Sequence, residues 1–155
     1  MALSLTSPHF SHNSPIPRLH TCDDADTAPT LEWSSAPSGT KSYVLIVDDP
    51  DAPDPKAPKM TYVHWVIYDI PTTATRLEGG KTPTGARDGI NDWKKPHYGG
   101  PCPPIGRHRY YFKLYALDAM LGDLGARATK ADVESAMKNH VLEKTELMGT
   151  YERSK

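Results

Sequence analysis

Most apolar segments of this chain alternate hydrophobic with polar or aromatic positions in the two-residue period of β-strands. The longest of them runs from 60 to 70, and it is bounded by proline-rich sequence on both sides. Proline and glycine clusters separate these segments, as they do between short strands of all-β proteins. The predicted strands are 3–7, 30–34, 42–47, 60–70 and 111–117. The turn at 36–40 predicts that the second and third of them form an antiparallel, hairpin-like pair.

The strand 60–70 has two distinguishable faces. One face carries Tyr62, His64, Val66 and Tyr68, and the other carries Val63, Trp65 and Ile67. Because side chains alternate across a strand, the second set is expected to pack into the core.

One helix is predicted, near the carboxyl terminus. Thr129 followed three residues later by Asp132 forms a capping box, and apolar side chains recur with helical spacing up to Val141. Residues 143–147 are expected to form another short turn that ends at Gly149. The sequence therefore predicts one mainly β domain over 1–155, a sandwich of antiparallel sheets with a short C-terminal helix.

Composition and charge exclude several classes of partner. Lys and Arg number 18 against 19 Asp and Glu, which gives a net charge of -1, and the longest basic run is the pair Lys94-Lys95. A nucleic-acid partner or an anionic membrane surface is therefore not expected. No apolar run is long enough for a transmembrane segment, and residues 1–6 lack the features of a signal peptide, so a cytoplasmic location is expected.

The chain has two cysteines, Cys22 and Cys102. Two cysteines are too few for a disulfide framework, and their spacing is not that of a metal site. Free thiols are the expected state, with a single bridge as the alternative.

Three segments carry candidate chemistry. Residues 48–55 crowd four carboxylates among prolines directly after a strand, and residues 99–110 form a stiff Gly/Pro loop that leads into the next strand. His108 and Tyr110 then share one strand face, and His64 lies on another strand. Taken alone, a Gly/Pro loop mostly punctuates structure, and a histidine on a half-buried strand is more often structural than functional. Together the three segments favour a site.

These segments resemble the phosphatidylethanolamine-binding protein family, in particular its bacterial and archaeal Raf-kinase-inhibitor-like branch. The resemblance is carried by Asp49-Pro50-Asp51-Ala52-Pro53, by His64, and by Gly100-Pro101 followed by His108-Arg109-Tyr110. It extends in one order over nearly the whole chain, from Ile16-Pro17 to Gly149-Thr150-Tyr151. Position by position, it implies a single pocket with eight ligand-binding residues: Asp49, Asp51, Tyr62, His64, Gly100, Pro101, His108 and Tyr110. Tyr62 replaces a tryptophan found in many relatives, and Cys102 replaces a proline of animal members.

The resemblance implies binding of a small anion or a phosphoethanolamine-like headgroup, without a cofactor. Two imidazoles and a phenol can donate hydrogen bonds to phosphate oxygens. A carboxylate would repel the anion, so Asp49 or Asp51 is expected to accept from an imidazole N–H or to meet the ammonium of a zwitterionic ligand. The resemblance also implies a regulatory role as a kinase or protease inhibitor, and a possible homodimer. The alternative is an inhibitor that acts through a surface loop, with an incidental pocket.

Two further interpretations fit the residues less well. A metal site built on Asp49 and Asp51 would lack the glycine and the final glutamate of a calcium loop, and no His-Glu-x-x-His is present. A hydrolase would need a nucleophile, for which Cys102 near His108 is the candidate, but a thiol between prolines has little freedom to attack. The sequence therefore predicts no catalytic residue, no metal and no enzymatic activity.

Overall fold

The computed structural model describes residues 2–153, which form two β-sheets, one α-helix and one 3₁₀ helix. The small sheet has the order β1-β3-β6, and the large sheet has the order β2-β9-β8-β4-β5-β7. All neighbouring strands are antiparallel except β2 and β9, which are parallel. The bounds are β1 Ser4–Thr6, β2 Ser14–Pro15, η1 Arg18–His20, β3 Leu31–Ser34, β4 Ser42–Ala52, β5 Met60–Ile70, β6 Arg76–Leu77, β7 Arg87–Asp88, β8 His108–Leu117, α1 Lys130–Met137 and β9 Val141–Tyr151.

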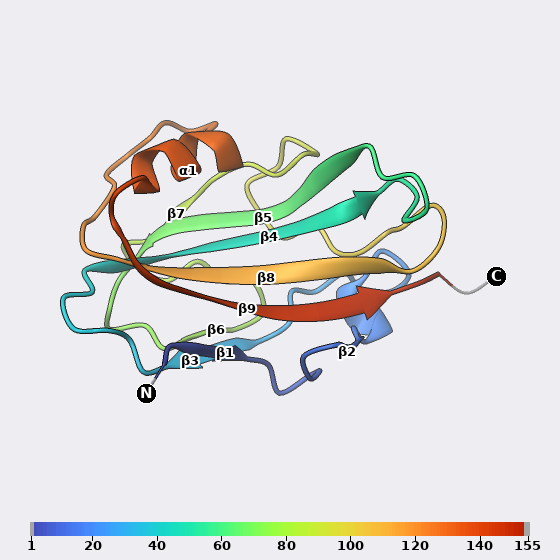
Figure 1. The fold of residues 1–155 in the computed structure, drawn as a ribbon, viewed down its shortest axis with the longest axis horizontal. Helices are drawn as coiled ribbons and strands as arrows, with labels where there is room; N and C mark the ends of the chain where they lie inside the picture. Colours follow the sequence, from blue (N-terminus) through green and yellow to red (C-terminus); the bar gives the residue numbers. More distant parts are fainter. Residues whose placement is uncertain (1, 154–155) are drawn as a thin grey trace.

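The large sheet lies between the small sheet on one face and α1 on the other (Figure 1). The main core fills the space between the two sheets, and it includes Leu31, Leu45, Ile67, Phe112 and Leu114, all fully buried. A second cluster lies under α1, where Val133 and Met137 of the helix pack against residues such as Val44 and Val66 of the sheet. The predicted sandwich of antiparallel sheets is therefore confirmed.

The predicted pairing of 30–34 with 42–47 is wrong. β3 pairs with β1 and β6, whereas β4 pairs with β5 and β8. The two segments face each other across the core instead, with the rings of Trp33 and Tyr43 at 5.6 Å between centroids. The chain leaves β3 through Ser35 in the left-handed region, at φ 65°, and enters the other sheet. Their apolar side chains are thus used for packing between sheets, a role that the alternating pattern does not distinguish from pairing.

The prediction for the carboxyl end is right for the start of the helix and wrong for the residues after it. Thr129 and Asp132 form the capping box. The helix ends at Met137, and residues 141–151 form β9, not a continued helix and a turn, so the helix is not the C-terminal element. β9 pairs with β8 along most of its length, and Leu147 is buried in the core. Pairing with the free edge of β8 outweighs the local helical spacing.

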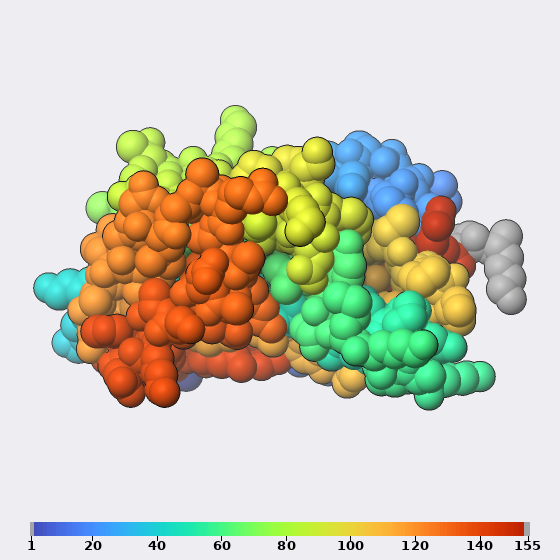
Figure 2. All heavy atoms as spheres, turned by 90° about the horizontal axis from the view of Figure 1, so that it is seen from above, coloured from blue at the N-terminus to red at the C-terminus, as the bar shows by residue number. Residues whose placement is uncertain are grey.

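β4 is also longer than predicted. It continues through the carboxylate-rich motif to Ala52, with register shifts against β5 near this end. The motif therefore extends to one end of the large sheet. Figure 2 shows the segments coloured for residues near 20, 55 and 105 gathered at that end, away from α1. No helix within 2–153 has the length and apolar character needed to cross a membrane.

Candidate functional site

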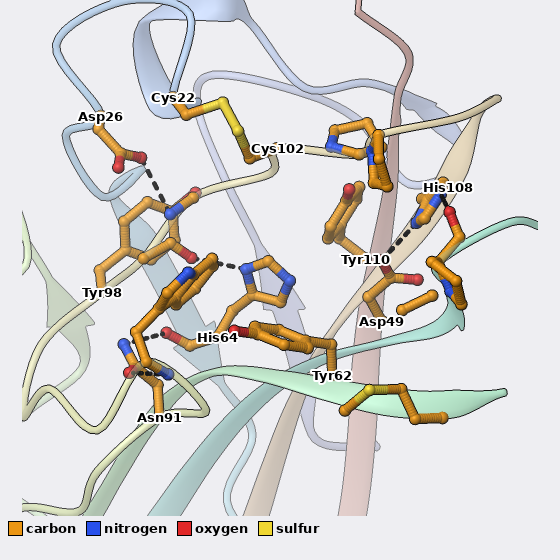
Figure 3. Close-up of a pocket in the computed structure, with 18 of the residues that line it drawn as sticks. Cys22, Asp26, Asp49, Tyr62, His64, Asn91, Tyr98, Cys102, His108 and Tyr110 are labelled. Atoms are coloured by element: carbon orange, nitrogen blue, oxygen red, sulfur yellow. Dashed lines mark hydrogen bonds and ion pairs between the residues drawn. A yellow bond between two sulfur atoms is a disulfide. The ribbon is translucent and has the colours of Figure 1, made fainter.

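A cavity of about 760 Å³ opens at the end of the large sheet where these loops meet (Figure 3). This volume lies in the range of sites for small molecules. Its walls come from the ends of β4, β5 and β8, from the loop around 22–26, and from the loop 91–104. Six of the eight predicted ligand-binding residues line it, namely Asp49, Tyr62, His64, Gly100, His108 and Tyr110.

His64 presents one free ring nitrogen to this cavity. The residue lies on β5 and is only 4% exposed. Its Nδ1 lies 2.7 Å from the Gly99 carbonyl oxygen, which can only accept, so Nδ1 carries the hydrogen and donates. Nε2 has no hydrogen-bond partner among the described residues, and Figure 3 shows it directed toward the centre of the cavity. Burial lowers the pKa of His64, so the neutral imidazole with a lone pair on Nε2 is favoured.

His108 has both ring nitrogens bound to protein acceptors. Nδ1 lies 2.6 Å from Asp49 Oδ2, and Nε2 lies 3.1 Å from the Pro53 carbonyl and 2.9 Å from the Ile105 carbonyl. Asp49 Oδ1 accepts a hydrogen bond from the backbone of Asp51 at 2.7 Å. The carboxylate that accepts from an imidazole is therefore that of Asp49, and the imidazole is that of His108. His108 joins β4 to two loops, and its expected donation to a ligand would require one of these bonds to break.

Two predicted ligand-binding residues do not line the cavity. The Asp51 carboxylate accepts three hydrogen bonds from Arg109, at 2.8 to 2.9 Å, through the backbone N–H and the guanidinium. These bonds lower the pKa of Asp51 despite its burial. Pro101 contributes its carbonyl to the Cys22 N–H at 3.1 Å. Both residues therefore bind to segments next to the cavity without lining the cavity themselves.

Three aromatic rings surround the His64 imidazole. Their centroids lie 5.5 Å away for Tyr62, 5.0 Å for Trp93 and 5.2 Å for Tyr110, each in an edge-on arrangement. Burial raises the pKa of both Tyr62 and Tyr110, so their hydroxyls stay protonated and can donate. The Tyr110 residue is 1% exposed, and its hydroxyl has no partner among the described residues. The cavity is thus an aromatic chamber with a few polar groups in its wall.

The loop that carries Trp93 is held by Asn91, a residue that sequence reasoning missed. The Asn91 side-chain oxygen accepts from the backbone of Trp93 and Lys95 at 2.9 and 3.1 Å. Its amide nitrogen donates to the His64 and His97 carbonyls at 3.3 and 2.8 Å. Three of these bonds lie within the loop, and the bond to the His64 carbonyl joins the loop to β5 beside the imidazole. No periodicity marks this segment, so the only sequence signal was its unusual length without secondary structure.

The expectation of free thiols is wrong, because Cys22 and Cys102 form a disulfide in the cavity wall. The two residues are 80 positions apart in the sequence, so their spacing gave no sign that they are close in space. Beside the bridge, the Gly100 N–H donates to Asp26 Oδ1 at 2.9 Å. Asp26 also lines the cavity, and burial raises the pKa of its carboxyl. The amino-terminal loop is therefore a wall of the site, which the predicted motifs did not include.

The charges at the cavity are unevenly distributed. Lys59 and Lys95 are exposed lining residues, and neither makes an ion pair with a residue in 2–153. The Asp49 carboxylate accepts a hydrogen bond from His108. Asp26 remains as a carboxyl group on the opposite wall from Tyr62, as Figure 3 shows. No group of three or more His, Cys, Asp or Glu side chains with the geometry of a metal site occurs in the described residues.

The chain belongs to the phosphatidylethanolamine-binding protein family, whose sequence model matches residues 6–152. A UPF0098 protein of Methanothermobacter thermautotrophicus is 44% identical over 97% of this chain and 99% of its own length. A UPF0098 protein of Aquifex aeolicus is 41% identical over 97% of this chain and 89% of its own length. The resemblance seen in the motifs is therefore confirmed over nearly the whole chain.

Solved structures of the family have the same fold. A phosphatidylethanolamine-binding protein homologue from Chlamydia trachomatis superposes with a TM-score of 0.91 at 40% identity, covering 99% of each chain. YbcL of Escherichia coli, described as a member of the mammalian family, gives 0.88 at 32% identity and covers 99% of this chain and all of its own. A carboxypeptidase Y inhibitor, solved with its cognate proteinase, shares the fold at a TM-score of 0.56 and 19% identity, covering 96% and 82%.

Proposed function

We propose that this protein binds small phosphate-type anions in the cavity around His64, without chemical conversion of the ligand. The observation that carries the proposal is Nε2 of the buried His64 side chain, which is directed into the cavity and has no partner among the described residues. A polar atom in such a position is normally satisfied by a partner, and a ligand can supply it. The Tyr110 hydroxyl offers a second, donating contact.

The surrounding charges support an anionic ligand. Lys59 and Lys95 line the cavity and attract anions, and the carboxylate of Asp49 is engaged by its hydrogen bond to His108. Asp26 has one carboxylate oxygen bonded to Gly100, and the other is available to an ammonium group. Phosphoethanolamine is a zwitterion, so its phosphate group matches the two lysines and its ammonium group matches Asp26.

Calorimetric titration with inorganic phosphate and phosphoethanolamine between about pH 5.5 and 8 tests the proposal across the titration range of histidine. Burial lowers the pKa of His64 when the cavity is empty, and a bound anion favours its protonated form. Binding therefore takes up a proton, and affinity increases as the pH falls toward and below 6.5. His64→Ala should abolish this pH dependence. Absence of binding by both ligands over the whole range would contradict the proposal.

The same cavity is proposed to couple ligand binding to inhibition of a kinase or a protease. The carboxypeptidase Y inhibitor has the same fold as this chain, so an inhibitor can be built on this fold. The exposed side chain of Ile105 lies beside a second hollow of about 820 Å³, which also includes Lys56 and Arg107. For a verified target enzyme, loss of inhibition in Ile105→Asp but not in His64→Ala would favour the surface-loop alternative.

A further inference from the structure

The cavity contains a hydrogen-bond acceptor where an anion site normally presents a donor. His64 Nδ1 is committed to the Gly99 carbonyl, so the hydrogen of the neutral ring is on Nδ1 and the lone pair is on Nε2. The second imidazole cannot compensate, because both nitrogens of His108 are bonded within the protein. An anion without a hydrogen would bring its own lone pairs against the lone pair of Nε2.

The groups around His64 do not supply that hydrogen. On β4, Asp49 is bonded to His108 and Asp48 is paired with Lys113 and Lys130. In the loop after β7, the Asp92 carboxylate accepts from the Val63 N–H at 2.7 Å.

The neighbouring phenols do not supply it either. Tyr62 on the same strand and Tyr110 on β8 lie edge-on to the ring of His64, and neither hydroxyl is bonded to Nε2. Burial lowers the pKa of His64 overall, and the hydrogen bond to Gly99 and the three nearby carboxylates oppose this effect only in part. The ligand must therefore bring the hydrogen, or the protein must bind a proton in the same step.

We infer that the cavity selects phosphate monoesters over phosphate diesters, because a monoester can donate a hydrogen to His64 Nε2 while Tyr110 donates to another of its oxygens. This inference rests on the proposed function. The second ionisation of a phosphate monoester lies near pH 6, so its P–O–H form is accessible at neutral pH. A diester, such as the headgroup of an intact phospholipid, has no P–O–H group in this range. It requires a charged imidazolium in a buried position, which costs free energy.

Both ligand classes bind with proton uptake at this pH, and they differ in where that proton can be held. A dianionic monoester that binds at pH 7.5 takes up close to one proton from the buffer, and that proton lies between Nε2 and a phosphate oxygen. The monoester can place it on either atom, whereas with a diester only Nε2 can hold it. Because only the monoester can hold the proton on its own oxygen and leave the buried ring neutral, the preference for the monoester should be about tenfold or more.

The experiment is calorimetry at pH 7.5 with phosphoethanolamine and its diester glycerophosphoethanolamine, each in two buffers that differ in ionisation enthalpy. We expect the monoester to bind at least about tenfold more tightly, with uptake of nearly one proton per ligand. Equal affinities, or proton uptake near zero for the monoester, would overturn the inference while leaving the proposed function intact. If neither compound binds at any pH, the proposed function itself fails.

Two controls separate proton donation from the larger negative charge of the monoester. Sulfate is a dianion like hydrogen phosphate but holds no proton at this pH, so it should bind at least about tenfold more weakly than inorganic phosphate. His64→Gln replaces the lone pair of Nε2 by an amide N–H, which can donate without binding a proton. Proton uptake should therefore vanish in this variant, and the preference for the monoester should disappear. Persistence of the preference in His64→Gln would assign the selectivity to charge and overturn the inference.

Discussion

The disulfide between Cys22 and Cys102 should contribute strongly to stability, and its removal is a direct test of the structure. The bridge closes a loop of 80 residues. In the chain-entropy description, a crosslink of this span restricts the unfolded chain by about 4 to 5 kcal/mol, which is an upper estimate. Three hydrogen bonds still join the same segments, including Gly100 to Asp26 and Tyr98 to the His20 carbonyl. The reduced protein should therefore fold, with lower stability.

Urea unfolding of the oxidised protein, the reduced protein and Cys22→Ser/Cys102→Ser measures this difference. A loss of about 4 kcal/mol at about 2 kcal/mol per molar urea lowers the midpoint by about 2 M. The midpoint of thermal unfolding should fall by about 8 to 16 °C. Reduced protein and double variant should agree, because both lack the crosslink. Two reactive thiols in the oxidised protein after denaturation, or midpoints that do not differ, would refute the reasoning.

Two further substitutions test the supports of the site. Asp51→Asn should lose about 1 to 2 kcal/mol at pH 7, since the partner Arg109 is half exposed. The pKa of Asp51 is lowered from 3.8 in the folded protein. Its contribution to stability is therefore present above pH 3.8 and is lost as the pH falls through the lower folded pKa. Acid unfolding followed by circular dichroism should show a smaller difference in stability between variant and parent at low pH. Gly149→Ala should cost about 1 to 3 kcal/mol in urea unfolding, because its Cβ would lie 2.5 Å from Ile16 Cγ1, and a midpoint equal to that of the parent would contradict this packing.

The long strands and the central motifs could be predicted because local sequence determines them. Residues 60–70 form β5 with the predicted bounds, and His108 and Tyr110 share the buried face of β8 as alternation requires. The capping box at Thr129 is a contact between residues three apart, so it too is visible in the sequence. Wherever the deciding interaction is local, prediction succeeded.

The failures concern interactions between distant segments. Residues 141–151 form a strand because the edge of β8 is available, although the helical spacing runs up to Val141. The bridge between Cys22 and Cys102 depends on a loop docking that no spacing reveals. Asn91 and Trp93 lie in a segment without periodicity, so their places beside His64 follow only from the packed fold.

The division of roles between the histidines also required the structure. The motifs place His64 and His108 near one cavity, but they do not show which of the two Asp49 contacts. The carboxylate lies on His108, and the bonds of that ring to the Pro53 and Ile105 carbonyls use its second nitrogen. His64 is therefore the imidazole with a nitrogen available to a ligand.

Nitrogen-15 NMR of the histidine side chains during titration with phosphate at pH 6.5 tests this central claim most directly. We predict that the Nε2 resonance of His64 moves from a value typical of an acceptor toward that of a nitrogen sharing or carrying a hydrogen. Both nitrogens of His108 should keep their resonances, since their bonds to Asp49 and to the two carbonyls persist. The variant His64→Gln provides the assignment. A shift of the His108 resonances with those of His64 unchanged would contradict the account.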